Sequence, residues 1–307
     1  MVARLIDGKV VSADVKSRVL RAVRELKAIG VQPCLATVLV GDDPASATYI
    51  ESKHKDAKEV GIVTRDHRLA GTFKQKELHE LVQLLNNDPE VHGILVQLPL
   101  PSHINELDIL SSLSPVKDVD GLTPYNVGML QSGIAALMPC TPSGIMELLN
   151  YYRIDVSGMD IVIVNRSNLV GKPLLILLLE RDATVTICHS KTKHLNEKLR
   201  NADLIVTAVG NRQRFTLTAN MIKEGVVVID VGIARLNGKL VGDLDFDSVK
   251  QKASWITPVP GGVGLMTRAM LLKNTVTAAA FITRELNDSS CWIKKKYDNR
   301  CLRYVTG

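Results

Sequence analysis

The stretch I-V-I-V-N-R-S-N-L-V-G-K-P, residues 161–173, decides how the second half of the chain is expected to fold. Its first four residues are apolar and β-branched, which is typical of a buried strand, and a polar turn follows them. The apolar run Leu174 to Leu179 then predicts a helix with Pro173 in its first turn. A strand, turn and helix in this order favour an anion such as a dinucleotide pyrophosphate at the helix N-terminus. An ordinary loop without a ligand fits these residues equally, because the G-x-G-x-x-G fingerprint is absent.

Strands and helices are expected to alternate along the whole chain. In the second half, apolar runs predict strands at 161–164, 184–188, 204–208, 226–230 and 255–257, with helical segments between most of them. In the first half, the patterns predict helices at 12–29, 44–60, 74–86 and 104–113 and strands at 34–40, 62–69 and 93–98. Such alternation is typical of parallel sheets covered by helices. The predicted fold class is therefore α/β with two domains, an N-terminal α/β domain and a Rossmann-like, doubly wound parallel sheet.

Local signals set the expected limits of the helices and domains. Ser12 is the expected N-cap of the first helix, and Asp43 that of the second. Residues 114–141 are interpreted as a long irregular segment, which places the domain boundary there. The predicted domains are 1–141 and 142–265, with a final helix at about 266–286 that packs back on the first domain and a tail at 288–307.

The composition excludes several classes of protein. Of the 307 residues, 46% are hydrophobic and 23% are charged, which is typical of a soluble globular protein. No apolar run approaches the roughly 20 residues of a membrane span, and no signal-peptide core is present, so a cytoplasmic protein is expected. Five cysteines without a C-x-x-C pair favour reduced thiols over structural zinc. The net charge of +6 is too evenly spread to indicate nucleic acid and suits small anionic ligands.

Polar residues at strand ends and on one helix are candidates for chemistry. Tyr49 and Lys53 lie four residues apart, on one face of a predicted helix, although a lone pair of this kind is usually solvated surface. Gln97 stands at the carboxyl end of a predicted strand, where ligands of open α/β sheets gather. Asp118 and Asp120 lie in a loop that Gly121 allows to turn tightly. No third hard ligand has a recognisable spacing, so no metal site is expected.

A set of short motifs carries a resemblance to one enzyme family. In order along the chain they are Y-I-E-S-K (49–53), Q-L-P-L-P (97–101), K-D-V-D-G-L (117–122), P-C-T-P-S-G (139–144), V-N-R-S-N-L-V-G-K-P (164–173), C-H-S-K-T (188–192), V-V-V-I-D-V-G-I (226–233), G-D-L-D-F (242–246) and T-P-V-P-G-G-V-G-L-M-T (257–267). In this order they resemble the methylenetetrahydrofolate dehydrogenase/cyclohydrolase family, known as FolD, over roughly residues 4–286.

The resemblance implies a function. Family members oxidise 5,10-methylenetetrahydrofolate to the methenyl cation with a nicotinamide cofactor and hydrolyse that cation to 10-formyltetrahydrofolate. The first predicted domain would bind folate and the second NADP. The implied partners are tetrahydrofolate substrates and a second copy of the chain, a homodimer formed through the cofactor domain, with no nucleic acid and no membrane.

The resemblance also assigns roles to residues of the folate half. Lys53 matches the family's catalytic lysine, Gln97 the glutamine that hydrogen-bonds and orients it, and Tyr49 the tyrosine beside the folate ring. Asp120 matches the aspartate that holds the pterin through adjacent N–H donors. The stretch Pro258 to Gly264, with Pro260, Gly261 and Gly262, matches a family loop that lies against both folate and nicotinamide. A lysine that removes a proton beside a cationic substrate must be largely neutral, and burial near a second positive charge favours that form.

The cofactor site follows in the same way. The implied cofactor-binding residues are Asn165, Arg166, Ser167, Val170, Gly171, Ser190, Thr192 and Ile233. NAD enzymes usually carry an acid after the second strand, to bind the ribose hydroxyls. Here that strand leads into C-H-S-K-T, residues 188–192, which contains no acid. Arg166 and Ser190 match the residues that receive the 2′-phosphate in family members that use NADP, so NADP is the expected cofactor.

Some residues depart from the family pattern, and other functions compete. Asn165 replaces a usual glycine, Leu265 a usual proline, and residues 210–215 a commoner G-x-P-G-x segment. One alternative is therefore a cyclohydrolase with weak or no dehydrogenase activity. A second is another NADP-dependent dehydrogenase on the same architecture, which leaves Gln97 and Asp120 unexplained. A nucleotide- or RNA-binding protein would need clustered aromatic residues, but aromatics make up 4% of the chain.

Overall fold

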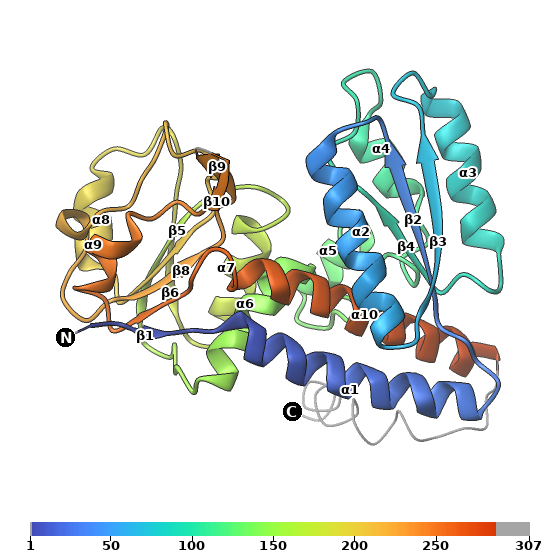
Figure 1. Cartoon of the computed structure of the whole chain (residues 1–307), viewed down its shortest axis with the longest axis horizontal. Helices are drawn as coiled ribbons and strands as arrows, with labels where there is room; N and C mark the ends of the chain where they lie inside the picture. The colour runs from blue at the N-terminus through green and yellow to red at the C-terminus, as the bar shows by residue number, and fades with distance from the viewer. Residues whose placement is uncertain (1, 237, 287–307) are drawn as a thin grey trace. The chain divides into compact units, whose positions relative to one another are not determined.

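The computed structural model describes residues 2–236 and 238–286, drawn in colour in Figure 1. These residues form two compact units. Unit 1 comprises residues 2–15 and 139–270, and unit 2 comprises residues 16–138 and 271–286. The first fifteen residues thus group with the second half of the chain, whereas the expected domain limits placed them in the first. The tail expected at 288–307 lies outside the described residues.

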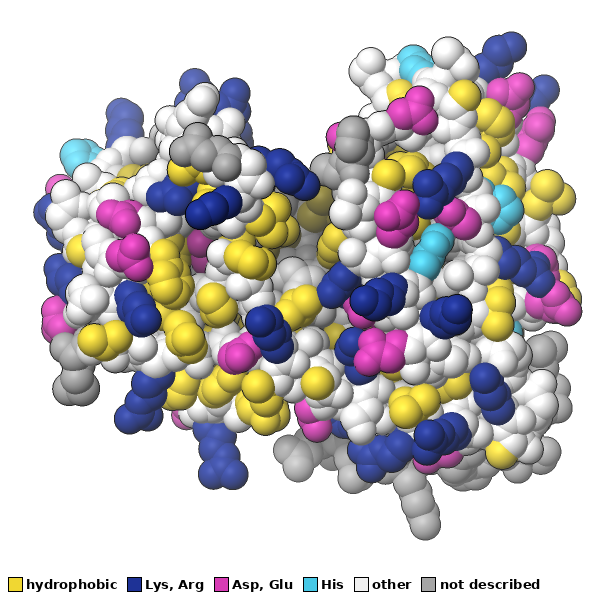
Figure 2. All heavy atoms as spheres, in the orientation of Figure 1, with side chains coloured by type: hydrophobic (Ala, Val, Ile, Leu, Met, Phe, Trp, Pro, Cys, Tyr) yellow, Lys and Arg dark blue, Asp and Glu magenta, His cyan; other side chains and the backbone are white. Residues whose placement is uncertain are grey.

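The surface carries charges of both signs. Lys and Arg side chains are scattered among acidic ones over the face shown in Figure 2, rather than gathered in one basic patch. Among the described helices, none combines the length and apolar character that crossing a membrane requires.

Unit 1 is built on a parallel sheet. Its strands are β1 (Arg4–Leu5), β5 (Asp160–Val164), β6 (Thr184–Cys188), β7 (Leu204–Thr207), β8 (Val227–Asp230) and β11 (Trp255–Ile256). They are ordered β1-β11-β8-β7-β5-β6, and each neighbouring pair is parallel. β7 and β8 are buried along their whole length, which explains their continuous apolar sequences. The predicted doubly wound parallel sheet is confirmed.

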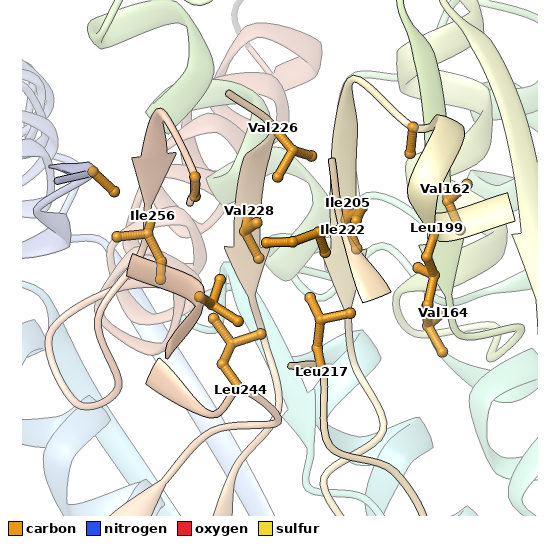
Figure 3. Close-up of a cluster of buried hydrophobic side chains, with 14 of the residues drawn as sticks. Val162, Val164, Leu199, Ile205, Leu217, Ile222, Val226, Val228, Leu244 and Ile256 are labelled. Atoms are coloured by element: carbon orange, nitrogen blue, oxygen red, sulfur yellow. The ribbon is translucent and has the colours of Figure 1, made fainter. Parts of the chain in front are cut away.

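Helices cover both faces of this sheet. They are α6 (Cys140–Tyr151), α7 (Gly171–Leu179), α8 (Leu195–Asn201) and α9 (Phe246–Lys250), with a short 3₁₀ turn, η1 (Ala219–Met221). Val162, Val164, Ile205 and Val228 point from the strands into the apolar cluster of Figure 3, which Leu199 of α8 joins. Alternate strand residues face the opposite side, where Figure 1 places α6 and α7.

Unit 2 contains a smaller parallel sheet. Its strands are β2 (Cys34–Val40), β3 (Val63–Leu69) and β4 (Gly93–Val96), ordered β3-β2-β4. Its helices are α2 (Pro44–Glu59), α3 (Gln75–Asn87), α4 (Glu106–Ser112) and α5 (Pro124–Gln131). The central strand β2 is buried at every residue, because β3 and β4 cover its edges and helices cover its faces. Helices α1 (Gly8–Ala28) and α10 (Val263–Leu286) contribute residues to both units.

Several local predictions need correction. α1 begins at Gly8, so Ser12 is not a cap; its hydroxyl donates to the carbonyl of Lys9 inside the helix, at 3.1 Å. The segment 114–141 was expected to be irregular but contains α5, whose N-cap Thr123 accepts from the N–H of Asn126 at 3.2 Å. A hairpin formed by β9 (Ala234–Leu236) and β10 (Lys239–Val241) was not predicted.

Candidate active site and cofactor site

In unit 2, the structure brings Tyr49, Lys53 and Gln97 together. Lys53 lies on α2 and is buried, with 5% of its surface exposed. Its Nζ donates to Oε1 of Gln97 at 3.0 Å and lies 4.4 Å from the centroid of the Tyr49 ring. The pair on α2 is therefore not ordinary solvated surface. A buried amine between an aromatic face and an amide oxygen is held in one place.

Two hydrogen bonds to backbone carbonyls orient Gln97 independently of Lys53. Its backbone N–H donates to the carbonyl of Val38 at 2.9 Å, and its side-chain Nε2 donates to the carbonyl of Leu98 at 2.7 Å. Because the amide nitrogen is engaged in this way, the amide oxygen is the atom presented to Lys53. Gln97 can thus accept one N–H of the lysine amine and aim the rest of that group.

The residues beside Lys53 differ in environment. Lys55, two residues after Lys53 on α2, is exposed. Burial lowers the pKa of His54, and the nearby Arg68 and Lys53 lower it further against the opposing effect of Asp66. His54 therefore carries no charge near neutral pH. Its Nε2 lies 2.9 Å from the hydroxyl of Thr37 on β2, which ties this turn of α2 to the sheet.

The loop that carries Asp120 is held on both sides. Asp118 is buried, and its Oδ2 accepts from the N–H of Thr123 at 2.7 Å and from Nδ2 of Asn126 at 2.8 Å. The carbonyl of Val119 accepts from Nδ2 of Asn274 at 2.8 Å. Asp118 thus braces the loop, and the half-buried Asp120 next to these anchors has a defined backbone position.

In unit 1, the side chain of Asn165 closes the turn between β5 and α7. Its Oδ1 accepts from the N–H of Ser167 at 2.8 Å, from the hydroxyl of Ser167 at 2.7 Å and from the N–H of Gly171 at 3.0 Å. Its Nδ2 donates to the carbonyl of Ala208 at 2.6 Å. A Cβ on Gly171 would overlap the Asn165 carbonyl, so only glycine fits there. Asparagine therefore replaces the usual glycine without opening the turn.

The other predicted cofactor residues lie in loops that follow parallel strands. Arg166 is exposed after β5, and Ser190 is exposed after the neighbouring strand β6. Thr192 accepts from the N–H of His189 at 2.8 Å, which shapes the second loop. Ile233 follows β8 and is 51% exposed, and Val170 is the half-buried N-cap of α7. Exposed cationic and hydroxyl groups on adjacent loops fit a phosphate of a nucleotide.

The loop of residues 258–262 packs against the start of α1. The N–H of Gly8 donates to the carbonyl of Gly261 at 2.9 Å. A Cβ on Gly8 would overlap the carbonyl of Gly262, so the close approach requires glycine. Pro260 is exposed and Gly261 is half-buried, whereas Gly262 is buried. The contact with Gly8 therefore fixes the loop, and Pro260 is exposed to solvent.

Two observations bear on other kinds of site. Within residues 2–236 and 238–286, no three His, Cys, Asp or Glu side chains are grouped as a metal ion would need. Cys34 and Cys188 are buried free thiols, and Cys140 is buried as well. Two buried carboxylates, Asp230 and Asp243, were not predicted as site residues, although each stands within one of the glycine-containing motifs, at 226–233 and 242–246.

Comparison with known proteins agrees with this arrangement. Residues 6–120 match the catalytic domain of tetrahydrofolate dehydrogenase/cyclohydrolase, and residues 139–283 match the NAD(P)-binding domain of the same family. The bifunctional protein FolD of Nitrosopumilus maritimus is 60% identical over 280 residues, which cover 91% of this chain and 98% of that protein.

Solved structures show the same relationship. The crystal structure of the bifunctional enzyme FolD from Campylobacter jejuni superimposes with a TM-score of 0.88 at 50% identity, covering 91% of this chain and 99% of that one. The Trypanosoma brucei methylenetetrahydrofolate dehydrogenase-cyclohydrolase, complexed with NADP cofactor and inhibitor, gives a TM-score of 0.87 at 37% identity and covers 94% and 99%.

Fold and site together define an α/β protein with a dinucleotide-binding sheet and a separate unit that carries a buried lysine. The chain belongs to the tetrahydrofolate dehydrogenase/cyclohydrolase family.

Proposed function

We propose that the chain oxidises 5,10-methylenetetrahydrofolate to 5,10-methenyltetrahydrofolate with NADP and hydrolyses the product to 10-formyltetrahydrofolate. The observation that carries this proposal is the hydrogen bond of 3.0 Å between Lys53 and Gln97, with the Tyr49 ring beside the amine. These residues stand in the family's motifs, and the chain matches both of the family's domains.

The lysine suits the hydrolytic step. Water adds to the methenyl carbon and loses one proton, which gives a neutral hydroxyl adduct. The hydroxyl then gives up its proton as the C–O bond becomes C=O, the C–N5 bond breaks and N5 takes up one proton, so that the 10-formyl product and one released proton result. A neutral Lys53 amine that donates one N–H to Gln97 keeps its lone pair for the proton of that water. Gln97 is then a positioning residue. Tyr49 and Asp120 are proposed to hold the folate, Tyr49 by stacking and Asp120 by accepting from the pterin N–H groups.

NADP is the proposed hydride acceptor of the first step. Arg166 and Ser190 are exposed on the loops after two paired strands, and residues 188–192 contain no acid to repel a 2′-phosphate. Asn165, Ser167, Val170 and Gly171 are proposed to shape the turn for the pyrophosphate, and Thr192 and Ile233 to complete the site. Pro260, Gly261 and Gly262 are proposed to contact the folate and the nicotinamide.

The remaining parts of the proposal concern organisation. Folate binding is assigned to residues 1–141 and NADP binding to residues 142–265, with the 266–286 helix associated with the first. We further propose that the chain forms a homodimer and is located in the cytoplasm. The family match supports folate as a substrate, and sedimentation of the purified chain tests the homodimer.

A direct assay tests the function. The purified chain is mixed with 5,10-methylenetetrahydrofolate and either NADP or NAD, and formation of the reduced cofactor is followed. In parallel, hydrolysis of 5,10-methenyltetrahydrofolate is followed without cofactor. We expect both reactions, with NADP preferred. Turnover of the methenyl compound without any cofactor reduction would favour a cyclohydrolase alone, the alternative that Asn165 in the cofactor turn raises. Absence of both reactions would refute the proposal.

A further inference from the structure

Two buried carboxylates of unit 1, Asp230 and Asp243, have no part in the proposed chemistry. Asp230 is the last residue of β8, and Asp243 lies between β10 and α9. Their exposed fractions are 2% and 0%. A buried carboxylate is costly unless donors surround it, so its partners indicate what it holds in place.

Asp243 holds the loop that follows β7. Its Oδ2 accepts from the N–H of Val209 at 2.7 Å, and its Oδ1 accepts from the N–H of Gly210 at 2.9 Å. Two successive peptide groups are thus fixed by one carboxylate. Burial raises the pKa of Asp243, whereas these two N–H groups and the nearby Arg212 guanidinium lower it. Gly210 adopts a φ of 67°, a left-handed conformation that suits glycine.

Asp230 holds Asp243 in turn. Its Oδ1 accepts from the backbone N–H groups of Asp243 and Gly232, both at 3.0 Å, and its Oδ2 accepts from that of Leu244 at 3.3 Å. Both carboxylates are packed closely against glycine residues. A Cβ on Gly242 would overlap the carboxylate of Asp230, and a Cβ on Gly232 would overlap that of Asp243. Neither carboxylate can shift without moving backbone.

The loop held in this way lies at the cofactor end of the sheet. β6 and β7 pair with opposite edges of β5, so the strand order reverses at β5 and a crevice is expected between the loops after β5 and β7. Ala208, at the start of the second loop, accepts from Nδ2 of Asn165 at 2.6 Å. Residues 208–210 are therefore held by Asn165 through one carbonyl and by Asp243 through the next two N–H groups.

We propose that Asp243, supported by Asp230, is a positioning residue for NADP that preorganises residues 208–210 beside the cofactor turn. The inference rests on the proposed NADP site. A loop that is already in its binding conformation loses less conformational freedom when the ligand binds, which raises affinity. Ile233 belongs to the same arrangement, because its carbonyl lies 3.4 Å from a Cβ built on Gly210. Loss of the Asp243 carboxylate weakens NADP binding and leaves the chemistry at Lys53 in unit 2 intact.

The test compares Asp243→Asn with Asp247→Asn, an exposed carboxylate on α9. The asparagine side chain at position 243 has the size of the aspartate. Its NH₂ group replaces one carboxylate oxygen and so faces the N–H of Val209 or Gly210, which loses its acceptor. We expect the Kd for NADP, measured by titration calorimetry, to rise about tenfold in Asp243→Asn. Hydrolysis of 5,10-methenyltetrahydrofolate without NADP is expected to stay within about twofold of the wild type, and Asp247→Asn to match the wild type in both.

An unchanged Kd for NADP in a folded Asp243→Asn protein would overturn the inference, as would an equal loss of both activities. If that variant does not fold, Thr207→Val takes its place, because it removes a hydroxyl that donates to Asp230 at 3.2 Å and preserves shape. A rise of about threefold in Kd then supports the inference, and no rise overturns it. A wild-type protein that does not bind NADP would refute the proposed function itself, before any variant is compared.

Discussion

Lys53 and Gln97 show how a short sequence pattern becomes a site. The lysine lies on α2 and the glutamine follows β4, so a parallel sheet brings together residues that are 44 positions apart. Both were predicted from their motifs. The direction of the Gln97 amide was not, because it depends on the carbonyl of Leu98.

Gln97→Leu tests the orienting role. The variant removes the Gln97 oxygen that accepts from the Lys53 amine at 3.0 Å. We expect kcat of the hydrolysis to fall by about tenfold to a hundredfold, with a smaller change in KM, because positioning acts on the reacting state. Gln83→Leu is the matched control, since Gln83 lies on α3 and donates to the carbonyl of Ser112 rather than to Lys53. Equal kcat values for the wild type and Gln97→Leu would contradict this role.

Asn165→Ala tests the turn of the cofactor site. The change removes one acceptor oxygen used by Ser167 and Gly171 and the donor to Ala208. We expect the Kd for NADP to rise about tenfold while hydrolysis without cofactor is retained. Asn201→Ala, at the exposed end of α8, should leave both unchanged. If Asn165→Ala bound NADP more tightly, the asparagine would be an obstruction rather than a support.

Asp230 predicts a pH dependence of stability. Burial raises its pKa to about 6, against the N–H groups of Asp243, Gly232 and Leu244, which lower it, while the Asp243 carboxylate adds to the rise. A folded-state pKa above the unfolded value of 3.8 means that this contribution is fully present below pH 3.8 and is lost as the pH rises through about 6.

The measurement is thermal unfolding of the wild type and of Asp230→Asn between about pH 4 and pH 7. The stability of the wild type should fall relative to the variant by about 3 kcal/mol over this range and then level off. Parallel profiles would show that Asp230 does not titrate there.

At the scale of elements, the strands were the most predictable part. β2 and β6 have the predicted limits, because short runs of apolar and β-branched residues favour extended backbone. β1 and the β9–β10 hairpin were missed for a physical reason. They are short, and their partners are distant or polar, so no period marks them. α5 was missed because it has only eight residues and contains a glycine, so its one helix signal, Thr123 followed by Pro124, was not recognised.

The cap of α2 carries an element-scale prediction. Asp43 accepts from the N–H of Ser46 at 2.8 Å at the start of the helix that holds Tyr49 and Lys53. Asp43→Ala should destabilise unit 2 by about 1 kcal/mol, measured as a lower midpoint of its thermal transition. Asp42→Ala, one residue earlier and exposed, is the control. Identical midpoints for the two variants would argue against the cap.

At the scale of the whole molecule, the sequence predicted the α/β class and the doubly wound sheet. It did not predict that residues 2–15 group with residues 139–270, because β1 has only two residues and pairs with β11 about 250 positions later. The two units also separate the proposed roles, with Lys53, Gln97 and Asp120 in unit 2 and the cofactor turn in unit 1. Variants of the cofactor turn in unit 1 should therefore weaken the NADP-dependent oxidation before the hydrolysis, whereas variants of the folate residues in unit 2 should affect both.

The proposed function depends above all on the buried amine of Lys53 as the group that performs the proton transfer. The most direct measurement is the kcat for hydrolysis of 5,10-methenyltetrahydrofolate by Lys53→Met and by Lys55→Met, an exposed lysine two residues away on the same helix. We expect a loss of about a hundredfold or more in Lys53→Met and wild-type activity in Lys55→Met. Full hydrolysis by a folded Lys53→Met protein would contradict the assignment of Lys53 as the base.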